Sequence, residues 1–128
     1  GGRLMLGGSY PLDIQSLDVA GVRVVEVRGE IDTSNARSLL STLIRIAEQE
    51  TSSKPVLIDV SAAQYLDAQA VRVFEAFAGH LESQRRGFAL TGSSYRVHRI
   101  LGLLEVGKFI PWFDSRQAAI NFLTSSGA

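Results

Sequence analysis

Residues 56–74 read VLIDVSAAQYLDAQAVRVF, and this stretch decides the fold. Val56, Ile58 and Val60 alternate with residues of mixed polarity, which predicts a strand with one apolar face and one mixed face. After a short turn, Asp67 stands where an N-cap carboxylate opens a helix. The apolar residues that follow recur at helical spacing: Ala70, Val71, Phe74, Phe77, Ala78 and Leu81. We therefore expect the start of this helix to form a defined surface.

Upstream of this stretch, the sequence predicts a hairpin and a first helix. Strand patterns at 12–17 and 22–28 flank Ala20-Gly21, a dipeptide typical of a tight turn. Candidate N-cap oxygens then follow on Asp32, Thr33 and Ser34. The helical apolar stripe after them consists of Ala36, Leu39, Leu40, Leu43, Ile44 and Ala47.

Downstream, the alternation of strands and helices continues. A strand is predicted at 88–91, and a capped turn leads into a third helical stripe over 97–104. A short strand at 109–113 contains a proline, which places it at a sheet edge or at the end of a strand. Asp114 or Ser115 then caps a last helix.

The expected element order is ββαβαβαβα. Alternating strands and helices with short connections predict a largely parallel sheet with right-handed crossovers, and the hairpin adds an antiparallel part. Crossovers made in one direction leave the helices on one face. The predicted fold class is therefore mixed α/β, with a largely parallel sheet, an N-terminal hairpin and helices on one face. We expect a single domain over 12–124, between tails at 1–11 and 125–128.

Composition excludes several classes of function. The chain has 128 residues, enough for one self-sufficient core, and it has no cysteine for disulfides or thiol chemistry. Its two histidines have no carboxylate at metal-ligand spacing, so no metal site is expected. Thirteen basic residues balance thirteen acidic ones, which disfavours binding to nucleic acid. The chain has no apolar run of membrane-spanning length and no secretory signal pattern, so we expect a cytoplasmic protein.

Residues 56–74, together with Gly29-Glu-Ile-Asp32, resemble the STAS domain, a family named for sulphate transporters and anti-sigma-factor antagonists. The resemblance extends from about residue 12 to residue 123 and implies the same fold. Phosphorylatable members carry Asp-Ser-Ser-Gly or Asp-Ser-Thr-Gly, whereas this chain carries Asp67-Ala-Gln-Ala70. Ala68 therefore stands at the phosphoacceptor position, without the hydroxyl that takes the phosphate.

The resemblance also implies a function by protein binding. In such relatives the domain captures an anti-sigma factor, often a serine kinase, and so frees a sigma factor. A phosphate at the helix start adds close to two negative charges to the surface that the partner covers, which turns binding off. Predicted partner-binding residues are Asp32, Thr33, Ser34, Asp67, Ala68, Gln69 and Arg72, with Tyr65 and Tyr95 as aromatic contacts beside them.

Alternatives to these assignments stay open. Asp32 is equally well explained as an N-cap, and Arg72 as a solvated side chain. The alanine at position 68 is compatible with a permanently competent binder, or with a binder modified at another hydroxyl such as Ser61 or Ser93. It is also compatible with a STAS subunit or domain that regulates a membrane transporter.

The segment GLLEVGK at 102–108 has the glycine and lysine spacing of a phosphate-binding P-loop. Phe109 stands where that motif needs a hydroxyl for magnesium, and the preceding residues predict a helix instead of a strand. We interpret Gly102 or Gly107 as a helix C-cap. With no other catalytic pattern in the sequence, we predict that the protein is not an enzyme and uses no cofactor.

Overall fold

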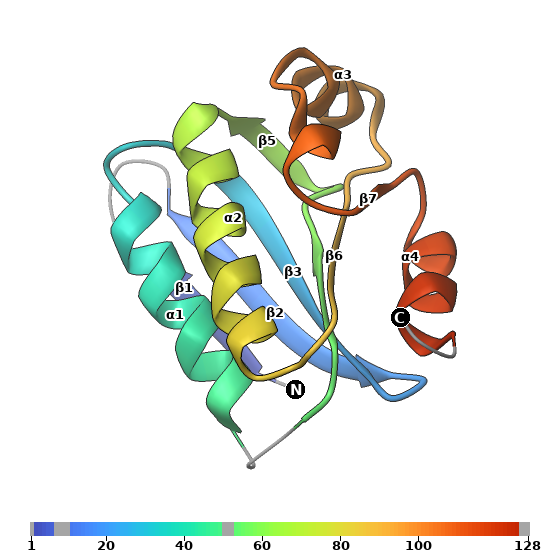
Figure 1. The fold of residues 1–128 in the computed structure, drawn as a ribbon. Coiled ribbons are helices and arrows are strands. Elements are labelled where there is room, and N and C mark those ends of the chain that lie inside the picture. Colours follow the sequence, from blue (N-terminus) through green and yellow to red (C-terminus); the bar gives the residue numbers. More distant parts are fainter. Residues whose placement is uncertain (1, 7–10, 50–52, 126–128) are drawn as a thin grey trace.

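The computed structural model describes residues 2–6, 11–49 and 53–125, and Figure 1 shows its ribbon. The strands are β1 (Gly2–Leu6), β2 (Leu12–Val19), β3 (Val22–Ile31), β4 (Val56–Asp59), β5 (Ala63–Leu66), β6 (Phe88–Thr91) and β7 (Trp112–Phe113). The helices are α1 (Ala36–Glu48), α2 (Ala68–Ser83), α3 (Tyr95–Leu103), the 3-10 turn η2 (Val106–Lys108) and α4 (Arg116–Thr124). Apart from Ser125, the tail predicted at 125–128 lies outside the described residues.

The strands form one mixed sheet in the order β1-β2-β3-β4-β6-β7, and β5 pairs with the end of β3. Pairing is antiparallel from β1 to β3 and parallel from β3 through β4 and β6 to β7. Ala20 and Gly21 make the hairpin turn between β2 and β3, both with positive φ. The predicted fold class, a mixed and largely parallel sheet with an N-terminal hairpin, is confirmed.

Two strands lie where the sequence predicted none. Strand β1 falls within the predicted tail at 1–11 and pairs with β2. Its first four residues are exposed, so it lacks the buried alternation by which a strand is identified in a sequence. Strand β5 occupies the predicted turn before Asp67, and it too has two exposed residues at its centre.

Gly29 lies where β3 changes its pairing partner. Its φ is +108°, and a Cβ atom there would lie 2.7 Å from the backbone oxygen of Pro11. The register between β3 and β5 shifts between Gly29 and Glu30. Beyond this point β3 pairs with β5, and the N–H of Asp67 donates to the carbonyl of Ile31 at 3.2 Å. The Gly-Glu-Ile-Asp motif is thereby joined to the start of α2.

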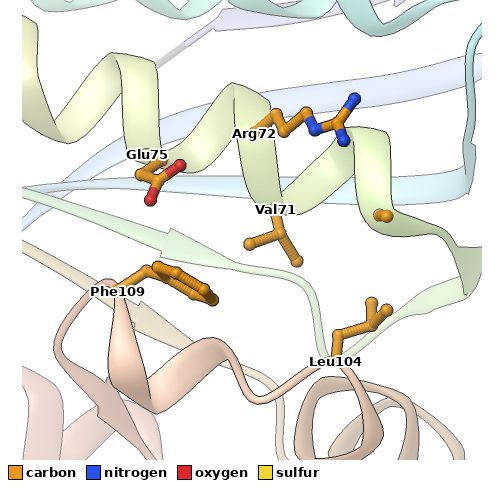
Figure 2. A pocket seen from close by; sticks show the side chains of 6 residues that line it. Val71, Arg72, Glu75, Leu104 and Phe109 are labelled. Carbon is orange, nitrogen blue, oxygen red and sulfur yellow. The ribbon is translucent and has the colours of Figure 1, made fainter.

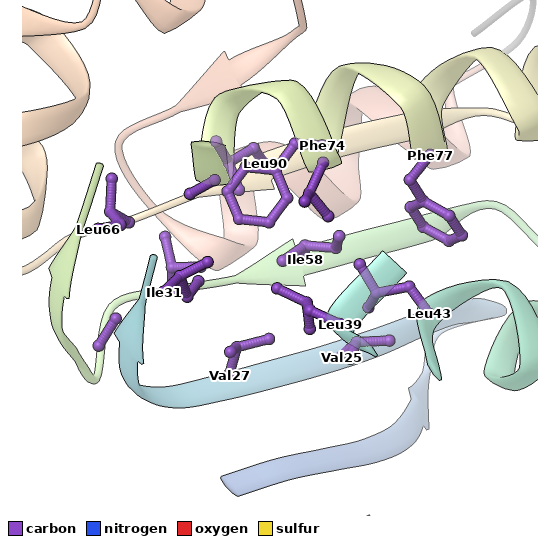
Figure 3. Close-up of a cluster of buried hydrophobic side chains, with 14 of the residues drawn as sticks. Val25, Val27, Ile31, Leu39, Leu43, Ile58, Leu66, Phe74, Phe77 and Leu90 are labelled. Atoms are coloured by element: carbon purple, nitrogen blue, oxygen red, sulfur yellow. The ribbon is translucent and has the colours of Figure 1, made fainter. Parts of the chain in front are cut away.

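The main core lies between the sheet and helices α1 and α2, which lie side by side against one face (Figure 1). Figure 3 shows its central side chains: Val25, Ile58 and Leu90 from the sheet, and Leu39, Leu43, Phe74 and Phe77 from the two helices. These residues are at most 1% exposed. The core thus holds both helices rigidly on the sheet, and with them the start of α2.

Helix α4 packs on the opposite face, which corrects the expectation that all helices lie on one side. Its buried residues contact a second apolar cluster of sheet residues, which contains Val24, Leu57 and Ala89. These three alternate with the core-facing residues of the same strands, so they point to the other side. The face that the sequence showed as mixed is therefore apolar where α4 covers it.

Arg116 fixes the start of α4 to this second face. Its guanidinium donates to the carboxylate of Asp59 at 2.9 and 3.1 Å and to that of Glu26 at 2.8 Å. Glu26 and Asp59 are direct partners in the parallel register of β3 and β4. Like charges placed opposite one another destabilise a sheet, and the arginine compensates this pair.

Candidate functional site

The start of α2 is built as the sequence predicts. Asp67 has extended backbone, and its Oδ1 accepts the N–H of Gln69 at 2.8 Å, so Asp67 is the N-cap of α2. Ala68 is the first helical residue and is exposed. Position 68 therefore stands on the surface, one residue beyond a cap that is tied to the end of β3.

The turn at 32–35 differs from the prediction in its hydrogen bonds. The N-cap of α1 is Asn35, so Asp32, Thr33 and Ser34 do not cap that helix. Instead, Oδ1 of Asp32 accepts the hydroxyl and the N–H of Ser34 at 2.6 and 2.8 Å. These two hydrogen bonds, the hydroxyl's first, lower the pKa of Asp32 below its ordinary value. The carboxylate thus stabilises the turn itself.

Asn35 supports this turn from inside the molecule. It is buried, its Oδ1 accepts the N–H of Asp32 at 3.1 Å, and its Nδ2 donates to the carbonyl of Glu30 at 2.8 Å. An asparagine beside an aspartate at the end of a strand is a weak sequence signal, because such residues also occur in solvated turns. Its buried position became evident only in the structure.

A hollow of about 290 Å³ opens beside Ala68 (Figure 2). We call it the Ala68 hollow, and its lining consists of Ala68, Val71, Arg72 and Glu75 from α2, with Leu104 and Phe109 from the segment around η2. Figure 2 shows Val71 directed toward Phe109 and Leu104, whereas the Arg72 guanidinium extends to the other side of α2. Phe109 is 54% exposed, so the hollow presents apolar surface to solvent.

A second hollow, of about 360 Å³, lies between α1 and α2. We call it the α1–α2 groove, and its lining consists of Thr33, Ala36, Arg37, Leu40, Gln69, Arg72 and Val73. Arg72 lines both hollows. The structure therefore brings together Thr33, Gln69 and Arg72, which were predicted as site residues from separate parts of the sequence.

The two predicted tyrosines lie on neighbouring elements but line neither hollow. Tyr65 is 47% exposed on β5, and Tyr95 is 81% exposed at the first position of α3. Helix α3 packs against β5, and Arg96 donates to the carbonyl of Gln64 at 3.4 Å. Both tyrosines are accessible to a partner, outside the two hollows.

Leu104 and Phe109 were not among the predicted site residues. The sequence placed Leu104 in the buried stripe of α3, and Phe109 at the start of a strand. In the structure, α3 ends at Leu103 and the last strand is only Trp112–Phe113, so both residues lie in the connection between them. An exposed aromatic residue in a connection leaves no periodic signal in the sequence.

The P-loop-like segment is a helix followed by a 3-10 turn. Gly102 is inside α3 and Gly107 inside η2, while Glu105 is the residue with left-handed backbone, at φ 55°. The proposed C-capping by these glycines is therefore wrong, and both lie against Trp112, where a Cβ atom would be 3.9 and 3.7 Å from the ring. The helix before Lys108 supports rejection of a phosphate-binding loop.

None of the helices within 2–6, 11–49 and 53–125 is long and apolar enough to cross a membrane. Over the same residues, no group of three or more histidine or acidic side chains is placed to hold a metal ion.

Comparison with known proteins agrees with this architecture. The family model of the STAS domain matches residues 13–119. An anti-sigma factor antagonist from Mycobacterium paratuberculosis is 24% identical, with a TM-score of 0.75 over 89% of this chain and 95% of that one. An RsbS variant from Moorella thermoacetica is 21% identical, with a TM-score of 0.63 over 86% and 93% of the chains.

A transporter domain has the same fold. The murine Slc26a9 anion transporter is 17% identical, with a TM-score of 0.65, and the match covers 84% of this chain and 18% of the transporter. A search of curated proteins found no match.

Proposed function

Because this chain belongs to the STAS domain family, we propose that it is a protein-binding regulatory module and acts as an anti-sigma-factor antagonist. The observation that carries this proposal is the exposed Ala68 on the rim of an apolar hollow, one residue after the Asp67 cap. The exposed Phe109 and the half-buried Leu104 offer apolar area to a partner, and burial of such area drives association. The structural likeness to an anti-sigma factor antagonist supports this choice of partner.

The proposed mechanism is competition in the cytoplasm, without catalysis. The module occupies an anti-sigma factor, of the serine kinase type, and thereby leaves the sigma factor free. Partner contacts are assigned to the turn at 32–35 and to the start of α2. The proposed contact residues are Asp32, Thr33, Ser34, Tyr65, Asp67, Ala68, Gln69, Arg72 and Tyr95. Because position 68 has no hydroxyl, we propose that binding is not switched off there.

The test of this surface is Ala68→Glu. An acidic residue in the first turn of a helix is stabilising by about 0.3 to 1 kcal/mol, so the fold is expected to stay as stable as wild type. A partner that covers the position must bury or repel the new charge. Affinity for the anti-sigma factor is then expected to fall by about 2 kcal/mol, roughly thirtyfold, in calorimetric titration.

The matched control is Ala118→Glu. Ala118 is an exposed alanine in the first turn of α4, and its N–H donates to the N-cap Ser115 at 3.1 Å. The substitution at position 118 lies on α4, which covers the sheet face opposite α1 and α2. Arg116, on the same helix, is unsuitable as a control because it bonds Asp59 and Glu26. Equal loss of affinity in both alanine variants would rule out the α2 start as the binding surface.

A phosphorylation assay distinguishes a permanently competent binder from a binder that is modified at another residue. After incubation with ATP and a kinase-type anti-sigma factor, mass spectrometry is expected to find no phosphate on residues 67–70, because none of them has a hydroxyl. Ser93 is one exposed alternative, and its N–H and hydroxyl donate to the hydroxyl of Ser61 at 2.9 and 3.0 Å. Stoichiometric phosphate on Ser93 would show that the protein keeps a switch at another helix start.

A second candidate function is regulation of a membrane transporter. The likeness to the STAS region of the murine anion transporter favours it, and so does the absence of a hydroxyl at position 68. Binding to a permease or its ATPase, with no affinity for an anti-sigma factor, would identify this function.

A further inference from the structure

The described lining of the α1–α2 groove contains two guanidinium groups and no carboxylate. Arg37 enters it from α1 and Arg72 from α2, and both side chains are exposed. Among the described residues, neither arginine has a hydrogen-bond or ion-pair partner. Two like charges thus face the same hollow without compensation.

Local structure does not account for these charges. Arg37 stands in the first turn of α1, where the helix dipole disfavours a cation. Asp32 and Asp67, which precede lining residues of the groove in the chain, are engaged elsewhere, since Asp32 accepts from Ser34 and Asp67 accepts from Gln69. Glu75 lines the hollow on the other side of α2. The groove therefore has a positive charge that the fold itself does not use.

The rest of the groove is suited to apolar contact. Ala36, Leu40 and Val73 line it, and the methylene stems of the two arginines extend along the same surface. A partner for this groove must combine negative charge with apolar side chains. Carboxylates on an amphipathic helix meet both conditions, because arginine binds carboxylate through paired hydrogen bonds and a helix fits a groove with one apolar face.

We propose that the α1–α2 groove binds an acidic amphipathic helix of the partner protein, with its carboxylates on Arg37 and Arg72 and its apolar face on Ala36, Leu40 and Val73. This inference rests on the proposed function, since it names the segment of the partner that this surface takes. The Ala68 hollow, on the other side of Arg72, receives a separate part of the partner.

The test uses the full chain and three synthetic helical peptides of one design, with glutamate, glutamine or lysine beside a leucine face. NMR titration of the isotopically labelled protein is expected to show that the glutamate peptide binds and shifts the amide signals of residues 36–40 and 69–73. The double variant Arg37→Gln/Arg72→Gln is expected to lose about tenfold in affinity. Arg37→Glu/Arg72→Glu is expected to bind the lysine peptide in preference.

The matched control removes the same net charge elsewhere. Arg45 on α1 and Arg99 on α3 are exposed and line neither hollow, so Arg45→Gln/Arg99→Gln is expected to keep wild-type affinity. Thermal melts verify that all variants fold. Equal binding of the glutamate and glutamine peptides, equal losses in the two double variants, or shifts confined to the Ala68 hollow would each overturn the proposal.

The failure of this inference can be distinguished from the failure of the proposed function. If Arg37→Gln/Arg72→Gln keeps its affinity for the anti-sigma factor while Ala68→Glu loses it, the groove assignment is wrong and the antagonist function stands. If the wild-type protein has no affinity for the anti-sigma factor but the glutamate peptide still binds as described, the groove assignment stands and the antagonist function fails.

Discussion

Asp67 connects the sheet to the candidate binding surface through two hydrogen bonds. Its N–H donates to the carbonyl of Ile31 at the end of β3, and its carboxylate accepts the N–H of Gln69 in the first turn of α2. A single residue thus fixes the direction in which α2 begins. Ala68 and the hollow beside it depend on that direction for their exposure.

This role predicts how two substitutions of Asp67 differ. Asp67→Ala removes the cap and is expected to lower the free energy of unfolding by about 1 kcal/mol. Asp67→Asn keeps an acceptor oxygen at the same place and is expected to stay within about 0.5 kcal/mol of wild type. Urea denaturation followed by circular dichroism measures both. Equal stability of wild type and Asp67→Ala would show that the cap does not hold this helix start.

At the scale of elements, strand β3 changes its pairing partners at Gly29. Residues before Gly29 pair with β2 and β4, and from Gly29 onward the strand pairs with the short strand β5. This change of partner needs the positive φ of Gly29 and its close approach to Pro11. The turn at 32–35 and the start of α2 become neighbours because of it.

Gly29→Ala is therefore expected to be strongly destabilising. The new methyl group would meet backbone 2.7 Å away, and the backbone angle is one that L-residues rarely adopt. We expect a loss of about 2 kcal/mol or more in the free energy of unfolding.

The control for Gly29→Ala is Gly79→Ala. Gly79 lies inside α2, and apart from its chain neighbours and the nearby helix backbone no atom of the described residues lies within 4 Å of a Cβ placed there. Alanine in a helix interior is favoured over glycine, so a gain of about 0.5 to 1 kcal/mol is expected. Chemical denaturation measures the free energy of unfolding of both variants. Similar changes in the two variants would refute the role assigned to Gly29.

At the scale of the whole molecule, an ion cluster holds the end of the sheet where β3 and β4 begin. Asp18 accepts from Arg23 at 2.9 Å and from Lys54 at 3.0 Å, while Arg23 also donates to the carbonyl of Ile46 at 3.2 Å. The hydrogen bond from Arg23, followed by that from Lys54, lowers the pKa of Asp18 from 3.8 to about 2. The cluster ties the β2–β3 hairpin to the last turns of α1.

This lowered pKa predicts part of the response to acid. A carboxylate whose pKa is lower in the folded state stabilises the fold above its unfolded pKa, and the effect is lost as the pH falls through its folded pKa. Asp18→Asn is therefore expected to melt below wild type at neutral pH, and the difference is expected to close between about pH 4 and about pH 2. The side chain is 42% exposed, so solvent screening keeps the effect small. Melting curves that stay parallel over this range would contradict the prediction.

The sequence alone determined which segments form the α-helices, that Asp67 caps α2, and that position 68 has no hydroxyl. Those features have local causes. The alternation in 56–60 spans five residues, and Asp67, Ser94 and Ser115 each accept an N–H two or three residues along the chain. Physical causes that act over such short separations remain visible in a sequence.

Only the tertiary structure decided which side of the sheet α4 covers, where β1 and β5 pair, and what lines the two hollows. Periodicity identifies the apolar side of an element but not the layer that covers it, and both faces of β4 have apolar residues. Arg116 donates hydrogen bonds to Asp59 and Glu26, which are 57 and 90 positions away in the sequence. Phe109 and Val71 likewise line one hollow beside Ala68. Packing brings these residues together, and their separation along the chain does not indicate that they are neighbours in space.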